Sequence, residues 1–276
     1  MPELPEVETI RQQLAKKISD KKITKVEVFT PKIINISQND FIKNTEGKLI
    51  RNIDRRAKIL IIELSNRAYL LCHLKLSGHL IYHPKKDESH SKFAHVIFYL
   101  SNGSKLVFDD FRKFGYVKFV RNKNELKSLF AKEGFGPEPF DSDFTKEKFK
   151  TLLLKKQKSP IKTLLMDQKF IAGVGNVYAQ EACFYAKINP QRKVKTLDDR
   201  EIGDLYDGLK KIMRRAIAMR GNSVDSYLDA EGKQGKFQNY LKVYDREGQI
   251  CFRCKTKIKK IWMAGRGTSF CPKCQR

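Results

Sequence analysis

Two Cys-x2-Cys pairs near the end of the chain could bind a metal ion. Cys251 and Cys254 form the first pair, Cys271 and Cys274 the second, and 16 residues separate the pairs. Two turns at this spacing can place four thiolates around one Zn²⁺ at about 2.3 Å each. Four protein sulfurs leave no position for water, so we expect one structural zinc ion. Disulfides or a redox pair are the alternatives.

Basic residues surround these cysteines, and no Asp or Glu occurs from 251 to 276. A zinc-stabilised hairpin with this charge suits entry into a nucleic-acid groove. The alternative is a solvated basic tail. The cations of this segment are Arg253, Lys255, Lys257, Lys259, Lys260, Arg266, Lys273 and Arg276.

The N-terminus, Met1-Pro2-Glu3, could also do chemistry. Methionine before proline is usually removed, which would leave Pro2 with a secondary amine. An α-amino group titrates near pKa ~8, and the positive end of a following helix lowers that value. Such an amine can attack a sugar C1′ to give an iminium ion, while Glu3 moves protons. Taken alone, however, the segment is better explained as a helix start, with Pro5 in the first turn.

Composition limits the class of partner. The chain has 276 residues, of which 41 % are hydrophobic, and 56 Lys and Arg against 31 Asp and Glu leave a net charge of +25. This excess favours a polyanionic partner, because neutralised phosphates release counterions. Charge does not separate DNA from RNA or an anionic membrane surface, and a lysine-rich proteome would also explain it. Because no apolar run reaches the roughly 18 residues of a membrane span, and no signal segment follows Met1, we expect an intracellular, soluble protein.

The pattern of elements predicts an α+β multidomain protein. Residues 6–18 have helical apolar spacing, and alternating β-type segments follow, two of them flanking an Asn-Gly turn at 101–104. We therefore expect a β-sandwich with a leading helix over 1–130 and a Gly/Pro-rich linker over 131–143. A helical domain over 144–238 contains the clearest helix, at 196–220, and a zinc hairpin domain covers 239–276.

A series of motifs in one order resembles the bacterial formamidopyrimidine-DNA glycosylases. Leu4, where the related oxidised-pyrimidine enzymes usually have glycine, favours the purine branch. The motifs are Met1-Pro2-Glu3-Leu4-Pro5-Glu6-Val7-Glu8-Thr9, Arg55-Arg56-Ala57-Lys58, His73-Leu74-Lys75-Leu76-Ser77-Gly78, Asp110-Phe111-Arg112-Lys113-Phe114-Gly115, Gly136-Pro137-Glu138-Pro139, Gly173-Val174-Gly175-Asn176-Val177-Tyr178 and Gly265-Arg266-Gly267-Thr268.

The resemblance implies four catalytic residues. Pro2 matches the Schiff-base nucleophile, and Glu3 matches the acid that assists glycosidic cleavage. Lys58 matches a lysine that serves β-elimination, although without the resemblance a solvated lysine at a strand end would be the preferred explanation. Arg266 matches the arginine of δ-elimination and phosphate binding, and a fixed guanidinium suits a phosphate.

The resemblance also implies DNA contacts. Leu76, Arg112 and Phe114 match three side chains that fill the gap left by an extruded base, where an apolar plug and an aromatic wedge replace lost stacking. Leu76 replaces the usual methionine. Core packing would explain Leu76 and Phe114 equally well.

Further DNA contacts are implied in the helical region and near residue 95. Asn176 follows two glycines and matches a phosphate-binding position of the family's helix–two-turn–helix (H2TH) element. Lys158 and Lys162 lie in a segment where relatives contact phosphates. His95 is the second of two histidines common in the family, and Phe93 takes the place of the first. The other histidines form no convincing metal constellation: His73, His79, His83 and His90.

The implied function is that of a bifunctional DNA glycosylase and abasic-site lyase. Its partner would be duplex DNA with oxidised bases or abasic sites, and its substrates 8-oxoguanine and formamidopyrimidines. Residues 223–238 would close over the everted base, and no redox or nucleotide cofactor is needed. We expect a monomer in the bacterial cytoplasm, associated with the nucleoid. The alternatives are a glycosylase for oxidised pyrimidines and a non-enzymatic zinc-ribbon nucleic-acid-binding protein.

Overall fold

The computed structural model describes residues 1–84 and 91–276, so His90 lies outside the described residues. The chain divides into two compact units. Unit 1 comprises Met1–Glu133 and Ala216–Gln238, and unit 2 comprises Gly134–Arg215 and Asn239–Arg276. The segment 216–238 therefore belongs with the N-terminal unit, whereas the sequence pattern placed it in the helical domain. Among the described residues, no helix combines the length and the apolarity that crossing a membrane requires.

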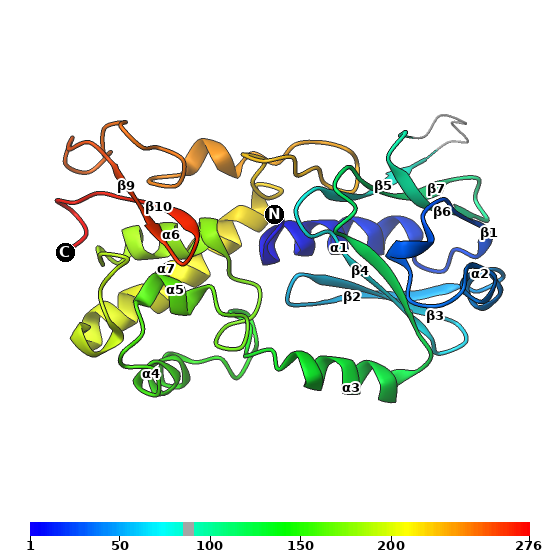
Figure 1. The fold of residues 1–276 in the computed structure, drawn as a ribbon, viewed down its shortest axis with the longest axis horizontal. Helices are drawn as coiled ribbons and strands as arrows, with labels where there is room; N and C mark the ends of the chain where they lie inside the picture. Colours follow the sequence, from blue (N-terminus) through cyan, green and yellow to red (C-terminus); the bar gives the residue numbers. More distant parts are fainter. Residues whose placement is uncertain (85–90) are drawn as a thin grey trace. The chain divides into compact units, whose positions relative to one another are not determined.

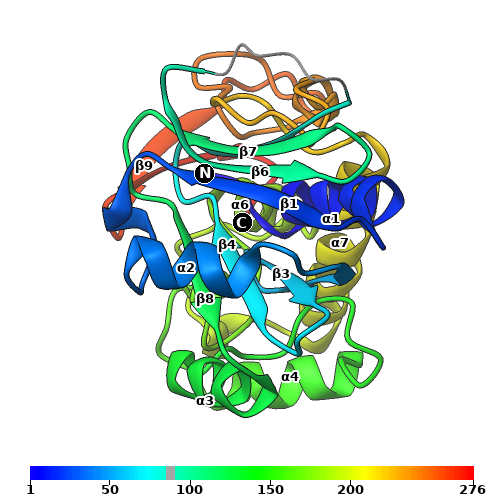
Figure 2. The ribbon, with the colours of Figure 1, turned by 90° about the vertical axis from the view of Figure 1, so that its right-hand side faces the viewer.

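Unit 1 contains the predicted sandwich. Two four-stranded antiparallel sheets have the orders β1-β6-β7-β5 and β2-β3-β4-β8, and Figure 2 shows them as two layers. Buried side chains from both sheets form one core, which includes Val26, Phe98, Leu106, Ile62 and Leu70. The strands are β1 (Ile23–Val28), β2 (Ile50–Arg56), β3 (Ile59–Leu64), β4 (Tyr69–His73), β5 (Gly78–His83), β6 (Ala94–Leu100), β7 (Lys105–Asp110) and β8 (Tyr116–Val120).

The leading helix α1 (Leu4–Ile18) confirms the predicted helix and packs against β2 and β3 (Figure 1). Glu3 and Glu6 form a capping box at its start, and a proline occupies its first turn. Its apolar side chains, such as Ile10 and Leu14, are fully buried in the sandwich core. The remaining helical segments of unit 1 are η1 (Pro31–Ile33), α2 (Gln38–Thr45) and α3 (Lys123–Glu133).

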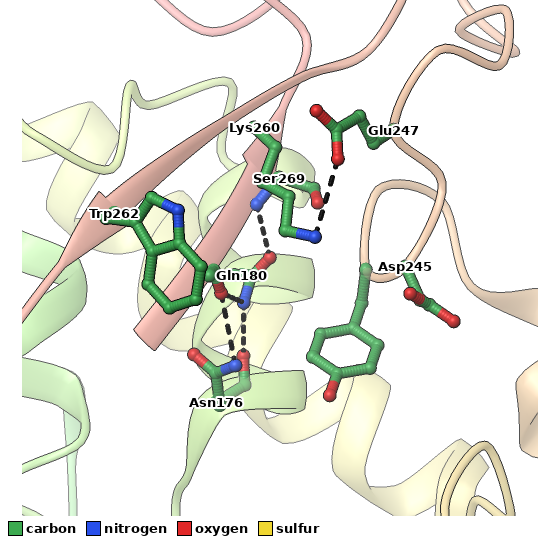
Figure 3. A pocket seen from close by; sticks show the side chains of 9 residues that line it. Asn176, Gln180, Asp245, Glu247, Lys260, Trp262 and Ser269 are labelled. Carbon is green, nitrogen blue, oxygen red and sulfur yellow. Dashed lines mark hydrogen bonds and ion pairs between the residues drawn. The ribbon is translucent and has the colours of Figure 1, made fainter. Parts of the chain in front are cut away.

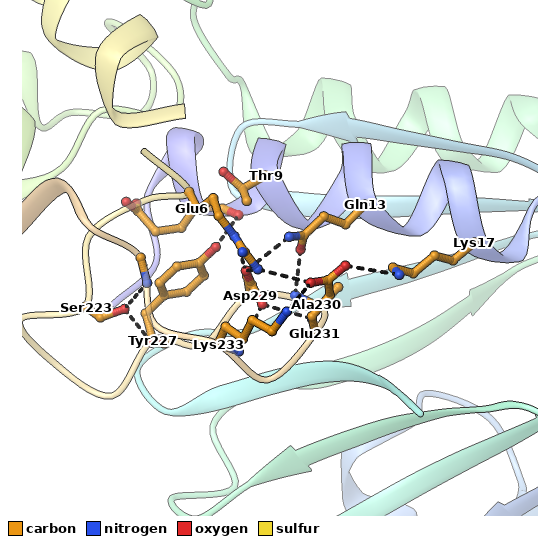
Figure 4. A network of polar contacts seen from close by, with 12 residues as sticks. Glu6, Thr9, Gln13, Lys17, Ser223, Tyr227, Asp229, Ala230, Glu231 and Lys233 are labelled. Atoms are coloured by element: carbon orange, nitrogen blue, oxygen red, sulfur yellow. Dashed lines mark hydrogen bonds and ion pairs between the residues drawn. The ribbon is translucent and has the colours of Figure 1, made fainter. Parts of the chain in front are cut away.

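The segment after α7 joins unit 1 through a buried polar network (Figure 4). Glu6 Oε1 accepts the backbone N–H of Asn222 at 2.9 Å, and the hydroxyl of Tyr227 donates to the carbonyl of Glu6. Gln13 Oε1 accepts the N–H of Ala230 at 2.9 Å, and both Tyr227 and Ala230 enter the sandwich core. These contacts with α1 are the physical reason that 216–238 does not stay with the helical unit.

Unit 2 consists of helices and a two-stranded hairpin. Its longest helix, α7 (Asp199–Ala218), buries the predicted apolar stripe of Ile202, Leu205, Leu209 and Met213. Gly221, with φ +83°, follows its end, as expected for a helix stop. The other elements are α4 (Lys146–Leu154), α5 (Ile161–Leu165), α6 (Asn176–Tyr185), η2 (Val194–Thr196), η3 (Phe237–Tyr240, at the junction of the units), β9 (Lys259–Met263) and β10 (Arg266–Phe270).

Candidate functional site

The N-terminal residues lie at the capped start of α1. Pro2 is buried and Glu3 is 3 % exposed. The backbone N–H of Glu3 donates to Glu6 Oε2 at 2.8 Å, which holds the residue after Pro2 in one position. The amine of Met1 makes an exposed ion pair of 2.9 Å with Asp225. While Met1 is present, Pro2 has an amide nitrogen, so any nucleophilic role of Pro2 requires removal of Met1.

Lys58 lies in the two-residue turn between β2 and β3. Arg56 pairs with Ile59 across this turn, and Ala57 has φ +53°. The side chain of Lys58 is only 5 % exposed, which excludes a solvated lysine at a strand end. Because α1 packs against both of these strands, the N-terminus and Lys58 belong to elements in direct contact.

Arg112 and Phe114 lie in the exposed loop between β7 and β8, and Phe114 is 59 % exposed. Core packing therefore does not explain Phe114. Leu76 is half-buried in the turn between β4 and β5. Buried Asp110 links the two segments: its Oδ1 accepts the hydroxyl of Ser77 at 2.5 Å and the N–H of Arg112 at 3.1 Å. The three residues expected to fill a gap in DNA are thus carried by two connected loops of unit 1.

His95 lies in β6 and is 3 % exposed. Its Nδ1 bonds Thr30 Oγ1 at 2.8 Å, and its Nε2 bonds the carbonyl of Asp110 at 2.9 Å. Both ring nitrogens are therefore occupied by protein partners. DNA contact by His95 stays a prediction, and this geometry does not favour it. Through its bond to the carbonyl of Asp110, His95 instead holds the start of the loop that carries Arg112 and Phe114.

The two lysines predicted to contact phosphates differ in exposure. Lys158 is exposed at the surface of unit 2, where a phosphate can reach it. Lys162, in α5, has no exposed surface. Its predicted phosphate contact is therefore not supported by its position, because a buried ammonium group cannot meet DNA without a rearrangement of α5. The sequence, in which the two residues are four positions apart, did not indicate that Lys158 is exposed and Lys162 is buried.

Asn176 begins α6 and connects it to β10. Its Nδ2 donates to the carbonyl of Gly267 at 3.2 Å, and Gln180 Nε2 donates to the same oxygen at 3.1 Å. Asn176 Oδ1 is buried and accepts no hydrogen bond from any residue that the structure describes. The backbone amides at the start of α6 point out of the helix, which is the arrangement that binds anions.

A cavity of about 330 Å³ opens beside Asn176 (Figure 3). Trp262, from β9, lies on one side of it, and Asp245 and Glu247 lie on the other. Lys260 pairs with Glu247 at 3.4 Å. The cavity wall thus combines both signs of charge with an exposed aromatic ring.

The four cysteines of the hairpin gather at one point, as predicted. Their Sγ atoms all lie within 4.8 Å of one another; Cys251 and Cys274 are 3.9 Å apart, and Cys254 and Cys271 are 3.4 Å apart. Four sulfurs at about 2.3 Å from one Zn²⁺ would be about 3.8 Å apart in a tetrahedron. The donor set fits one structural zinc ion.

Arg266 starts β10 at the tip of the zinc hairpin and is exposed. The turn that precedes it contains Ala264 and Gly265, both with positive φ, and Arg266 pairs with Met263 across it. A cation on a short hairpin whose base is held by metal can contact a phosphate with little loss of side-chain freedom.

Several residues organise these sites through partners that the sequence does not indicate, even where the residues occur in the family motifs. Asp110, Glu6 and Gln180 are buried polar side chains whose partners lie 33 to 216 residues away, as shown by Asp110–Ser77, Glu6–Asn222 and Gln180–Ser269. Such pairs arise from tertiary packing, so periodicity and local motifs cannot indicate them.

His79 connects β5 to the segment 216–238. Its Nδ1 lies 2.8 Å from Asp109 Oδ1, and its Nε2 lies 2.6 Å from the carbonyl of Ser226. Both partners are acceptors, so both nitrogens must carry protons. Burial lowers the pKa of His79, but the bonds to Asp109 and Ser226 outweigh it, and the net shift is upward.

A raised pKa makes the contribution of His79 to stability dependent on pH. Because the folded pKa exceeds the unfolded value of about 6.5, this contribution is complete below pH ~6.5 and is lost as the pH rises through the folded pKa. We expect NMR titration of the His79 ring to give a pKa above 6.5. In His79→Gln, the melting temperature should fall less between pH 6 and pH 8.5 than in the wild type. An equal fall in both proteins would contradict the role of His79.

The β-sandwich with its capped N-terminal helix, and the helical unit with its four-cysteine basic hairpin, define the class of DNA glycosylases that contain an H2TH element and a zinc hairpin. Three family models match the chain: the formamidopyrimidine-DNA glycosylase N-terminal domain over residues 1–117, the H2TH domain of the same enzymes over 135–227, and the zinc finger found in FPG and IleRS over 248–276. The chain belongs to the formamidopyrimidine-DNA glycosylase family.

Relatives and solved structures match over the full length. The formamidopyrimidine-DNA glycosylase of Pelotomaculum thermopropionicum is 42 % identical, covering 100 % of this chain and 99 % of the relative, and that of Listeria monocytogenes is 40 % identical with both chains fully covered. A complex of Lactococcus lactis Fpg with abasic-site DNA has a TM-score of 0.92 at 37 % identity over 99 % of both chains. MutM with DNA that contains carbocyclic 8-oxo-G has a TM-score of 0.91 at 36 % identity, with both chains fully covered.

Proposed function

We propose that this protein excises oxidised purines, 8-oxoguanine and formamidopyrimidines, from duplex DNA and then cleaves the strand at the abasic site. The observation that carries the proposal is the Pro2–Glu3 segment, which is buried and leads into the capped helix α1. Solved relatives support the substrate class, since they hold DNA with Fapy-dG, an abasic site or carbocyclic 8-oxo-G.

In the proposed mechanism, the amine of Pro2 attacks C1′ of the damaged nucleotide. The bond from C1′ to the base breaks, and the leaving base takes up a proton; when the sugar ring opens, its O4′ takes up another, which Glu3 helps to deliver. Loss of the remaining amine proton and opening of the sugar give an iminium ion at C1′. Buried Lys58 lies in the turn between β2 and β3, the two strands that contact α1, and its ammonium group assists these transfers in the proposal.

Strand cleavage follows from the iminium ion, which acidifies the C2′ proton. Removal of that proton breaks the C3′–O bond in β-elimination, and a second elimination breaks the C5′–O bond. Each step expels a phosphate as the leaving group. Exposed Arg266 can hold one of these phosphates through charge-assisted hydrogen bonds. The two eliminations leave a one-nucleotide gap.

DNA binding in this proposal uses both units. The loops with Leu76, Arg112 and Phe114 occupy the gap that the extruded base leaves. Asn176 and Lys158 of unit 2 contact phosphates, and the zinc hairpin adds positive charge. Residues 223–238 close over the everted base from their attachment to α1. The protein acts as a monomer in the bacterial cytoplasm, at the nucleoid.

Single-turnover excision tests the substrate class. We expect rapid release of base from duplexes with 8-oxoguanine or a formamidopyrimidine opposite cytosine, and slower release of thymine glycol opposite adenine. Undamaged duplex serves as the control and should remain intact. Faster release of thymine glycol than of 8-oxoguanine would instead assign the protein to oxidised pyrimidines. Binding without release of any base would leave only a nucleic-acid-binding role.

A further inference from the structure

Phe111 is an exposed aromatic residue whose role the proposed function does not include. It lies beside Arg112 in the loop between β7 and β8, and its side chain is 67 % exposed. Phe114, the proposed wedge, lies three residues later in the same loop and is 59 % exposed. Two large apolar rings on one short exposed loop are costly in water unless a partner covers them.

The ring of Phe93 packs against the ring of Phe111. The two rings are packed edge to face, with centroids 5.1 Å apart and an interplanar angle of 83°. Lys92 Nζ lies 5.2 Å from the centroid of the Phe93 ring. Phe93 is half-buried. Phe93 is thus the residue against which the exposed ring of Phe111 packs.

The backbone of this loop is held in one conformation. Asp110 is fully buried, and its Oδ2 accepts the N–H of Gly115 at 2.7 Å. The N–H of Asp110 donates to the carbonyl of Phe93 at 3.1 Å, which joins the loop to the strand below it. Gly115 must be glycine, because a Cβ there would lie 2.7 Å from the ring of Phe108 and 2.9 Å from the carbonyl of His73. A rigid loop loses little freedom when its side chains are covered.

The charge around Phe111 identifies the chemistry of the partner. Lys92, Arg112 and Lys113 are exposed beside the two rings. The carboxylate of Asp110 is buried and accepts hydrogen bonds from Ser77, Arg112 and Gly115. Asp109 is bonded to His79. An apolar surface bordered by cations suits a polyanion with apolar faces. Kinked duplex DNA has that character, since unstacking exposes the faces of bases and sugars between the phosphates.

We propose that Phe111, seated on Phe93, is a second aromatic contact of this loop with damaged duplex DNA, packing against the nucleotide that flanks the extrusion site. The inference rests on the proposed function, in which the loop enters the duplex. Phe114 fills the gap, while Phe111 covers the adjacent unstacked step. Phe93 gives this second ring apolar support from the protein side.

The test measures binding of the full-length zinc-loaded protein to a duplex with a tetrahydrofuran abasic analogue and 2-aminopurine at the flanking position. We expect Phe111→Ala to weaken binding about tenfold and to reduce the change in 2-aminopurine fluorescence. The slope of log Kd against log salt should stay as in the wild type, because no phosphate contact is lost. Phe93→Ala should weaken binding in the same direction. Phe111→Leu, which keeps apolar volume without the aromatic face, should fall between wild type and Phe111→Ala.

Leu129→Ala is the matched control, since Leu129 is an exposed apolar residue on α3; it should bind as the wild type does. The melting temperature of Phe111→Ala should match that of the wild type, because the ring is exposed. If Phe111→Ala binds normally while Phe114→Ala binds weakly, the inference fails and the proposed function stands. If the wild type does not prefer damaged over undamaged duplex, the proposed function itself fails. A salt slope lowered by about 1 in Phe111→Ala would also overturn the inference, because it would show displaced cations.

Discussion

Replacement of Pro2 by glycine is expected to reduce borohydride trapping of the protein on 8-oxoguanine duplex DNA at least about 100-fold. Glycine keeps an amine but lacks the ring that fixes the direction of the amine. A small displacement of a nucleophile reduces the reaction rate by about 100-fold. Pro2 is buried at the start of α1, and the Glu3–Glu6 bond holds the following residue in place, so the wild-type amine has a defined position. Trapped complex is measured on denaturing gels, with the intact mass showing that Met1 is absent.

Glu3→Gln is the control for the trapping experiment. It keeps the amine of Pro2 and should still trap DNA that already contains an abasic site, whereas its release of 8-oxoguanine should fall. Two results would contradict the mechanism: Pro2→Gly that traps as efficiently as the wild type, or full activity in a protein that retains Met1. In the latter, the amine belongs to Met1, whose ion pair with Asp225 holds it at the surface.

Substitution of Cys254 by alanine is expected to release the zinc ion and to weaken DNA binding at least about 100-fold. The cluster of buried residues around the metal site is small, comprising Phe184, Val243, Cys251, Ile258 and Cys271. A core of that size cannot hold a hairpin together, whereas structural zinc contributes on the order of 10 kcal/mol. Without the metal, the cations of 251–276 are no longer presented on a fixed hairpin. Metal content per chain and the Kd for damaged duplex are the measurements.

Cys72→Ala is the matched control for the zinc experiment. Cys72 is fully buried in β4 of unit 1, far along the chain from the hairpin, and burial raises the pKa of its thiol to about 12. This variant should keep one zinc ion per chain and normal DNA binding, with a lower melting temperature from the lost packing. A Cys254→Ala protein that still carries one zinc ion and binds normally would show that the four-cysteine site is not structural.

Local patterns predicted a large part of the fold. The helix predicted at 6–18 and the long helix predicted at 196–220 were confirmed. An apolar stripe of period 3.6 forms one face of a helix, whichever element covers that face. The Asn-Gly turn was confirmed between β6 and β7, with Gly103 at φ +81°. Helix α3 was not predicted. Its apolar residues Leu126, Leu129 and Phe130 have helical spacing, but this stripe of three is short, and none of the residues of α3 is buried.

For residues with no local signature, tertiary packing decided which unit they belong to and whether their side chains are buried. The sequence placed 216–238 with the helices before it, but Tyr227 and Ala230 enter the sandwich core. His95 and Lys162 carry groups that suit phosphates, yet the structure buries both. Burial depends on what other segments cover a residue, and those segments lie far away in the chain.

The four cysteines are where the amino-acid sequence alone determined the chemistry, and the Pro2–Glu3 segment is where it predicted a nucleophile. Thiol pairs at zinc spacing follow from the order of residues, which packing does not change. Tertiary structure alone decided how that chemistry is positioned: the burial of Lys58, the contacts of Glu6 and Asp110, and the Phe93–Phe111 pair. The physical reason is that desolvation and hydrogen-bond partnership are properties of neighbours in space, which one-dimensional order does not specify.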